Sequence, residues 1–452
     1  MLTSSYPQTL RSLPRALPRA LALTRPIALA GLCSMLAGPL YAQSDSMQTI
    51  VQDFLDTGLV FQNHDPTPYL YLGDPEDVTV ARASSMDLAE TVAQLGLLQN
   101  RLSLLPEAEN DQQRKRRESL SERLTATITR GQILLGEPPA DFQTESSLIF
   151  GVEAPLYDEA HFRNLSTELE ELIPGDEPLV ERVANFRDQF VIPPDRLELV
   201  ISRAMEECRA RTLEHLELPA DEKVTLNINE NMPYVGFTEY RGNSHSVVHL
   251  NASVPVHIER AIELGCHEGY PGHHVHATLL EQEIINNRGW DEYKLVTLLG
   301  PYSVITEGAA SFAEDLAFTP EERMQFNAEV LMPLAGLDAS NLALYANYTE
   351  LVSELNFARN AVANAYLYEG LERNAAIEWL MEYGLETRGT ASQRLDFIDL
   401  QRAYVLTYNY GKQLVSDYIG DTLSEDPNQA WKEFVEILLA PLGPQDLLQR
   451  TL

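Results

Sequence analysis

Most of the chain beyond residue 45 repeats its apolar residues at the spacing of an amphipathic helix. From residue 256 to the C-terminus the pattern is helical almost throughout. Apolar positions three and four residues apart lie on one face of an α-helix, so each such segment predicts a helix that buries that face. The same spacing predicts earlier helices over residues 86–105, 110–136, 157–173, 177–190 and 195–217. The sequence therefore predicts a mainly α fold.

One region, between residues 223 and 251, alternates apolar and polar residues instead. The alternation predicts strands at 224–228, 237–240 and 246–250. A turn-forming segment, 241–244, separates the last two and contains Gly and Asn, which predicts a hairpin. We therefore expect a small β element just before the His-rich segment that follows.

The first 42 residues have the composition of an export signal. Four arginines precede an apolar run from Ile27 to Leu40, no acidic residue occurs before Asp45, and Ala42 offers a small residue for cleavage. We interpret residues 1–42 as a signal peptide, which predicts a periplasmic or extracellular protein.

The remainder divides into an N-terminal helical region, 43–220, and a metal-binding catalytic region, 221–452, expected to form one continuous fold. No segment after the signal has about 18 uninterrupted apolar residues, so we expect no membrane insertion of the mature chain.

Charge excludes several classes of partner. The chain has 67 acidic residues against 33 Lys and Arg, a net charge of −34. Binding to nucleic acid or to an anionic membrane needs a basic surface, so we expect neither. The excess predicts a heavily solvated acidic surface, and an acidic cleft that selects cationic substrates is the alternative.

Cys208 and Cys266 are the two cysteines outside the signal. Export permits a disulfide between them, but spacing alone does not establish the pairing. Cys266 precedes His267 directly, so a buried free thiol beside the site is the alternative.

The eight residues from His267 to His274 read His-Glu-Gly-Tyr-Pro-Gly-His-His. Zinc peptidases commonly carry His-Glu-x-x-His on a helix, where two imidazoles one turn apart reach a single ion and the Glu acts as general base. Here Pro271 stands where the second His would be. Glu268 keeps the position of the catalytic base.

The second ligand must come from beyond the proline. On a regular helix His273 would lie on a different face from His267, and His274 would lie about 10 Å further along. Pro271 interrupts helical hydrogen bonding and Gly272 adds backbone freedom, so a bulged turn there would bring His273 to the ion. We expect His273 to be the ligand and His274 to support the site or bind substrate. The reverse assignment stays open.

The third ligand is expected from a later helix. Glu307 opens an apolar helical run, and Glu314 follows two turns later on the same face. We therefore predict one zinc ion held by His267, His273 and Glu307, with Glu314 holding a ligand imidazole.

These two motifs resemble those of the bacterial domain-of-unknown-function 885 family, which is grouped with gluzincin-like zinc metallopeptidases. The resemblance implies a gluzincin-like helical fold, zinc, and hydrolysis of peptide bonds, with His267, Glu268, His273 and Glu307 in the roles given above. The chain departs from the family at Ala309 and Phe312, where Trp and Tyr are common, and lacks a later Asp-Thr-Gly-Leu-His run.

Such a peptidase needs a substrate-binding edge strand and a group that stabilises the oxyanion. The candidates for the edge are Tyr240, Arg241, Gly242 and Asn243. The candidates for the oxyanion are His245, Arg402, Tyr408 and Tyr410.

The expected function is thus an exported zinc-dependent hydrolase that cleaves a peptide or small amide substrate. The alternatives are a zinc hydrolase of non-peptide amides or esters, and an exported metal-binding protein without catalysis.

Overall fold

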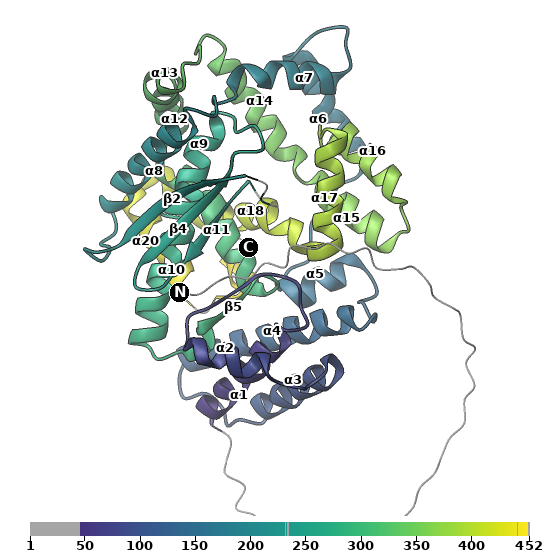
Figure 1. Ribbon diagram of the computed structural model, residues 1–452, viewed down its shortest axis with the longest axis vertical. Helices are drawn as coiled ribbons and strands as arrows, with labels where there is room; N and C mark the ends of the chain where they lie inside the picture. Colours follow the sequence, from purple (N-terminus) through teal and green to yellow (C-terminus); the bar gives the residue numbers. More distant parts are fainter. Residues whose placement is uncertain (1–45, 231, 233–234, 441, 451–452) are drawn as a thin grey trace, which may run out of the picture.

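The computed structural model describes residues 46–450, except 231, 233, 234 and 441. The predicted signal peptide, residues 1–42, lies outside these residues. Almost all regular structure is helical, with two small sheets, so the prediction of a mainly α fold is confirmed (Figure 1).

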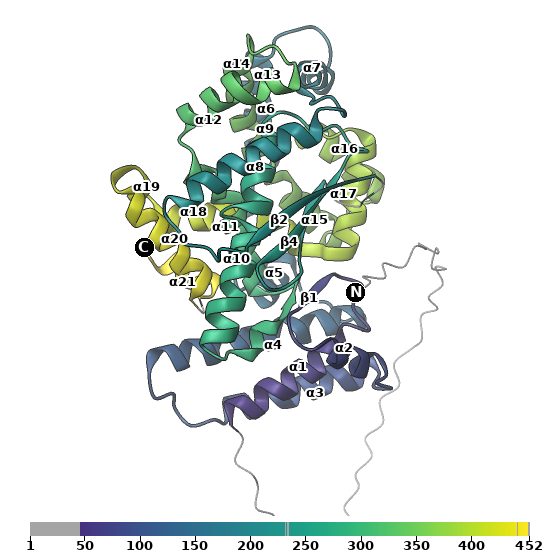
Figure 2. The same ribbon diagram turned by 60° about the vertical axis from the view of Figure 1, so that its left-hand side comes forward.

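The N-terminal helices pack into a layer of their own at one end of the molecule (Figures 1 and 2). They are α1 (Met47–Phe61), α2 (Pro75–Arg82), α3 (Leu88–Ser103) and α4 (Asp111–Leu134). Polar caps define where they begin: Asp87 and Glu90 form a reciprocal capping box at the start of α3. The leucine and isoleucine faces of these helices share a separate core.

Buried charges fix this layer to the rest of the molecule. Arg130 of α4 donates two hydrogen bonds to Asp65, at 2.9 and 3.0 Å, and a third to the carbonyl of Leu400. Both charged side chains are almost fully buried. Removing either partner would leave a buried charge without compensation, so the pair holds the segment after α1 on α4. The hydrogen bond from Arg130 to Leu400 connects this layer to the C-terminal half.

The remaining helices form the main body. They are α5 (Phe142–Phe150), α6 (Glu159–Leu172), α7 (Leu179–Arg187), α8 (Leu197–Leu213), α9 (Glu259–Leu264), α10 (His273–Leu279), α11 (Pro301–Ala317), α12 (Pro320–Phe326), α13 (Met332–Ala335), α14 (Leu342–Leu355), α15 (Ala358–Tyr368), α16 (Arg373–Tyr383), α17 (Arg388–Gln401), α18 (Leu406–Ile419), α19 (Thr422–Glu425), α20 (Pro427–Leu439) and α21 (Pro444–Arg450). One hydrophobic core runs through this body from α4 to α21. It takes residues from both sides of position 220, so regions 43–220 and 221–452 share it.

The predicted β element is present. Strands β2 (Lys223–Asn229), β3 (Gly236–Tyr240) and β4 (His245–Asn251) cover the three predicted strands, and β3 and β4 form the predicted antiparallel hairpin. β2 runs parallel to β4, which gives the order β2-β4-β3 and leaves β3 at an edge of the sheet. A second, unpredicted sheet pairs β1 (Tyr69–Tyr71) with β5 (Leu295–Thr297).

The helix that leads into the His-rich segment is held closely against α8. α9 continues into a π-helical turn, η2 (Gly265–Gly269). A Cβ at Gly265 would lie 2.9 Å from the backbone nitrogen of Met205, so only glycine allows this approach. One residue further, Cys266 forms a disulfide with Cys208 of α8, with 5.4 Å between their Cα atoms. The two cysteines are therefore paired, and they anchor η2 on α8.

Replacing both cysteines should lower the free energy of unfolding. The disulfide closes a separation of 58 residues, for which loop-closure entropy predicts a stabilisation of about 4 kcal/mol. We expect Cys208→Ser/Cys266→Ser to unfold at a lower urea concentration than the wild type. A reductant should lower the wild type to the same midpoint and leave the double variant unchanged. Equal midpoints without reductant would contradict the prediction.

Candidate metal centre

The His-rich segment is a break between two helices. After η2 the chain turns at Tyr270 to Gly272, and α10 begins at His273. The N–H of Gly272 donates to the carbonyl of Cys266 at 2.9 Å. A Cβ at Gly272 would overlap the carbonyl of His267, so this turn requires glycine. The expected bulged turn at Pro271-Gly272 is thus present as a helix break that directs α10 back toward η2.

The second motif lies where α11 crosses α18. A Cβ at Gly308 would overlap the carbonyl oxygen of Gly411, and one at Gly411 would lie 2.7 Å from the carbonyl of Val304. Two facing glycines therefore let the helix backbones touch. Glu307 precedes Gly308 directly, so its carboxylate is positioned by a tight helix crossing.

The structure brings His267, His273 and Glu307 together, and this group is termed the His/Glu cluster. Nε2 of His267 lies 3.5 Å from Oε2 of Glu307, and Nε2 of His273 lies 3.7 Å from Oε1. One candidate ligand atom from each residue lies within 4.8 Å of the others. Tetrahedral zinc with donors at about 2.0–2.1 Å would place those donors about 3.4 Å apart.

Glu307 also has an unsatisfied atom in the cluster. Its side chain is buried, and Oε2 has no hydrogen-bond partner among the described residues. Burying a carboxylate oxygen without a partner is costly unless a cation or a donor compensates it. Two imidazole nitrogens and such a carboxylate are a donor set that suits zinc, so the residues present fit a zinc ion.

Within the cluster, the positive charge of His273 and the negative charge of Glu307 stabilise each other. Burial disfavours the charged form of His273, but the neighbouring carboxylates of Glu307 and Glu268 together outweigh burial and raise the pKa of His273 to about 9. Burial would likewise raise the pKa of Glu307, yet the charge of His273 and the proximity of both imidazoles hold it far below its ordinary value. The carboxylate is therefore ionised and attracts positive charge.

Glu268 is held by the edge strand of the sheet. It lies on η2 beside His267 and is buried. The hydroxyl of Thr238, on β3, lies 2.7 Å from Oε2 of Glu268 and 2.8 Å from its backbone carbonyl. Thr238 thus fixes the carboxylate predicted to act as base, a role that its place in an alternating strand did not indicate.

Tyr404 touches the cluster and was not predicted. Its hydroxyl donates to Oε1 of Glu307 at 2.7 Å from the short helix η6 (Arg402–Val405), which precedes α18. The ring of Tyr408, a predicted oxyanion residue, packs edge-on against Tyr404 with centroids 5.6 Å apart. Tyr408 therefore lies one side chain away from Glu307. In the sequence Tyr404 looks like any core aromatic residue.

His274 points away from the cluster. It is fully buried, its Nδ1 lies 2.8 Å from the hydroxyl of Ser246, and its Nε2 lies 3.0 Å from Glu222. Tyr270 donates to the same carboxylate oxygen at 2.5 Å. Both ring nitrogens are occupied, so the structure gives His274 neither the ligand position nor access to substrate. It joins β2, β4 and α10 next to His273.

The expected role of Glu314 is wrong. Its carboxylate pairs with Arg323, which also bonds Asp315, and Lys412 lies 2.6 Å from Asp315. No carboxylate holds the free ring nitrogen of His267, since Nδ1 is buried without a partner among the described residues. Glu314 lies about two helical turns after Glu307 on α11 and belongs to a separate ionic network.

His245 lies on the wrong face of the sheet for the predicted catalytic role. Thr238 pairs with Val248, three residues after His245 on β4. Side chains three positions apart on a strand point to opposite faces, so His245 points away from the face that contacts Glu268. Its ring is exposed and bonds the carbonyl of Asp221 at 3.0 Å.

The predicted substrate edge also shifts. Arg241, Gly242 and Asn243 form the hairpin turn, in which Gly242 and Asn243 have positive φ angles of 77° and 53°. The hydroxyl of Tyr240 donates to Glu281 at 2.6 Å, and the tyrosine is buried. The strand edge beside Glu268 is β3. Residues of β3 before Tyr240 therefore occupy the substrate-binding position that the sequence had assigned to residues 240–243.

Arg402 and Tyr410 are not brought to the cluster. Nε of Arg402 donates to Glu145 at 2.8 Å and Nη2 donates to Tyr368 at 3.1 Å, which uses the guanidinium in a buried link between α5 and α15. Tyr410 is half-buried, and burial followed by the charge of Asp417 raises its pKa. The structure therefore gives neither residue a contact with His267, His273 or Glu307.

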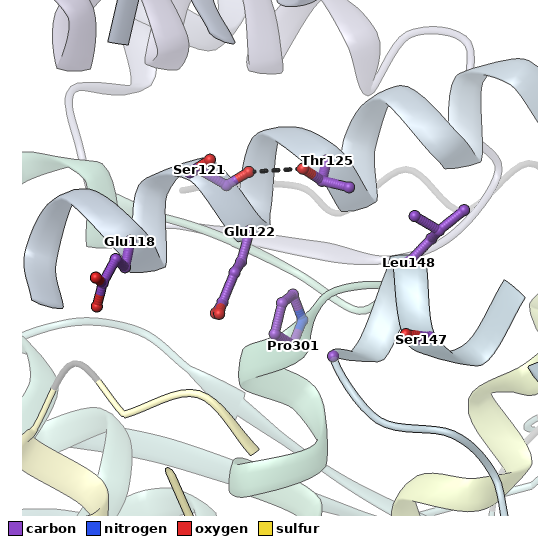
Figure 3. Close-up of a pocket in the computed structure, with 8 residues that line it drawn as sticks. Glu118, Ser121, Glu122, Thr125, Ser147, Leu148 and Pro301 are labelled. Atoms are coloured by element: carbon purple, nitrogen blue, oxygen red, sulfur yellow. Dashed lines mark hydrogen bonds between the residues drawn. The ribbon is translucent and has the colours of Figure 1, made fainter. Parts of the chain in front are cut away.

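A hollow of about 260 Å³ lies elsewhere, between α4, α5 and the start of α11 (Figure 3). Glu118 and Glu122 point into this region from one side of α4. Burial, and then the charge of Asp446, raise the pKa of Glu122 to about 7. None of the predicted site residues lines this hollow.

No model of a known protein family matches the sequence, and no functionally curated protein matches it. The resemblance to the 885 family therefore rests on the two motifs alone. No helix within the described residues is both long and apolar enough to cross a bilayer.

Three solved structures are distantly similar. A protein from Colwellia psychrerythraea, described as a lipoprotein, is 14% identical with a TM-score of 0.49, over 80% of this chain and 69% of that chain. A protein of unknown function from Shewanella oneidensis, also described as a lipoprotein, is 12% identical with a TM-score of 0.46, over 82% and 75%. The protein BsuCP is 12% identical with a TM-score of 0.40, over 89% and 90%. Similarities this distant carry no conclusion about function.

Adding one methyl group at the helix crossing should destabilise the site. In Gly308→Ala the new Cβ must displace the backbone of Gly411, so we expect the free energy of unfolding to fall by about 1–3 kcal/mol. The control is Gly96→Ala in α3, where a Cβ meets nothing within 4 Å. It should stabilise the protein by up to about 1 kcal/mol through helix propensity. Urea unfolding measures both, and a Gly308→Ala variant as stable as Gly96→Ala would contradict the prediction.

Proposed function

We propose that this chain is an exported zinc-dependent peptidase whose active site is the His/Glu cluster together with Glu268. The observation that carries the proposal is the convergence of His267, His273 and Glu307 from three separate helical elements. A base candidate, Glu268, is adjacent to one of the ligands. A purely structural metal site has no need of such a carboxylate.

His267, His273 and Glu307 would hold the ion. When bound, zinc supplies a Lewis acid that polarises a carbonyl and lowers the pKa of a water molecule. Tyr404 keeps Glu307 oriented by donating to one carboxylate oxygen and leaving the other free. A histidine must be neutral to bind a metal, so the ion would displace the proton that the charge of Glu307 otherwise keeps on His273.

Glu268 handles the proton. It accepts a proton from the attacking water and passes it to the leaving amine. The hydrogen bond from Thr238 fixes the direction of its carboxylate. Because Thr238 belongs to the edge strand β3, a peptide that pairs with this edge would lie beside Glu268. That placement favours an extended peptide over a compact amide or ester.

The export part of the proposal rests on residues 1–42 and on the disulfide. A disulfide between Cys208 and Cys266 is typical of an oxidising compartment, such as the periplasm or the exterior of the cell. Both observations support the same location.

The replacement Glu268→Gln tests the reaction. We expect this variant to bind one zinc ion like the wild type and to lose hydrolysis by at least about 10²–10⁴-fold, because the amide cannot accept the proton. Zinc content by elemental analysis and turnover of a peptide library measure the two properties. Glu283→Gln is the control, since Glu283 accepts a hydrogen bond from Asn287 away from the cluster; it should change neither.

The same assay separates the alternatives. Cleavage of esters or non-peptide amides without cleavage of peptides would replace the peptidase by another zinc hydrolase. Stoichiometric zinc with no hydrolysis of any substrate would indicate a metal-binding protein without catalysis. A fully active Glu268→Gln variant would overturn the assigned base.

Tyr404→Phe should weaken the metal site. Loss of the hydrogen bond to Glu307 removes a contact that orients this carboxylate from outside the two histidines. Groups that orient ligands typically contribute about 10–100-fold to metal affinity. The matched control is Tyr345→Phe, which removes a 2.6 Å hydrogen bond from a buried tyrosine to Glu259. Competition with a chelator measures zinc affinity, and equal affinities for both variants would contradict the assignment.

A further inference from the structure

Two arginines from two helices share one carboxylate outside the His/Glu cluster. Arg359 of α15 and Arg394 of α17 both donate from Nε to the same oxygen of Glu386, at 3.4 Å each. Glu386 is buried, and its second oxygen has no partner among the described residues. Arg359, Arg394 and Glu386 are termed the arginine group.

The arginine group has more positive charge than its carboxylate balances. Glu386 is shared by Arg359 and Arg394. Two guanidinium groups thus face one carboxylate. Burial, and then the charge of Arg394, lower the pKa of Arg359 to about 10. A partly buried guanidinium beside like charges is stabilised by an added anion.

The guanidinium groups still have donors to offer. An arginine side chain has five N–H donors. Within the described part of the chain, the terminal amino groups of Arg359 and Arg394 form no hydrogen bond, and each side chain is 27% exposed. Paired N–H groups of this kind match the two oxygens of a carboxylate. The arginine group therefore has both the charge and the geometry to bind one.

Side chains of α17 and η6 link the arginine group to the His/Glu cluster. The guanidinium of Arg394 lies 5.8 Å from the ring centroid of Phe397, and the centroid of that ring lies 6.1 Å from that of Tyr404. Arg394 lies on α17, which leads through η6 to Tyr404, the residue that touches Glu307. Both views group α15, α16 and α17 together (Figures 1 and 2).

On the basis of the peptidase function proposed above, we propose that the arginine group binds a carboxylate of the substrate. The substrate class is a peptide that carries this carboxylate either as its free C-terminus or as an acidic side chain.

Binding to the Glu268→Gln form of the mature chain tests this assignment. Three peptides that differ only at the C-terminal residue are compared by calorimetry: the free acid, the C-terminal amide, and an amide with Asp as its last residue. We expect the acid or the Asp peptide to bind at least about tenfold more tightly than the plain amide. Adding Arg359→Gln should abolish the difference, and Arg359→Lys, which keeps the charge but loses the planar fork, should restore only part of it.

Arg388→Gln is the matched control. Arg388 lies on the same helix as Arg394, its side chain is 59% exposed, and its ion-pair partner, Glu378, is 69% exposed. This variant should keep the full preference. Thermal unfolding checks that each variant folds, and Arg394→Gln serves as the second charge-removing variant if Arg359→Gln does not.

The outcomes separate this assignment from the proposed function. A preference for the acid alone identifies the C-terminus as the source, and an equal gain for the Asp peptide identifies a side chain. A preference lost on removal of either arginine, in a wild type that cleaves no peptide, keeps the carboxylate site and overturns the peptidase. Equal binding of all three peptides, no binding of any, or a preference that survives both arginine replacements overturns the carboxylate site.

Discussion

The site depends on a close backbone contact between Gly272 and the carbonyl of His267. No side chain fits there, so the chain can fold back sharply only because residue 272 is glycine. This contact ends the helix that carries His267 and Glu268 and starts another at His273. Two histidines that a continuous helix would place on different faces thereby turn toward one carboxylate. Without the break, the cluster would lack its second imidazole.

The other parts of the site are held by contacts of the same kind. Gly265 lets η2 approach α8, where the disulfide to Cys208 fixes it, and Gly308 lets α11 touch α18 beside Glu307. Each cluster residue therefore sits next to a point where the helix position is fixed by backbone contact. Positions fixed in this way leave little freedom for the side chains, and such preorganisation is what a metal centre with few ligands needs. The fold places rigid helices, and not loops, around the cluster.

The sequence predicts those features that depend on local spacing. The β hairpin and the assembly of His267, His273 and Glu307 follow from short patterns, and the interruption at Pro271 follows from the known effect of proline on helices. Contacts between distant residues were missed, because a local pattern does not show which partner a polar side chain will find. Arg402 was expected near the site, but it pairs with Glu145, 257 residues earlier in the sequence. Likewise, nothing around Tyr404 or Thr238 distinguishes them from ordinary core or strand residues, although each contacts a carboxylate of the site.

The net negative charge of the chain affects how an anionic peptide would approach the arginine group. In a chain with a net charge of −34, guanidinium groups with little exposure can be neutralised by a carboxylate each, as Arg130 is by Asp65 and Arg402 by Glu145. The arginine group differs because its positive charge exceeds that of its partners. An anionic peptide would therefore be repelled at long range by the whole molecule and attracted only within a few ångströms of Arg359 and Arg394. Salt weakens long-range repulsion between solvated charges more than it weakens a partly buried contact, so moderate ionic strength would favour association with such a peptide. This is the opposite of the usual effect of salt on binding between opposite charges, and it follows from the contrast between the acidic surface and the arginine group.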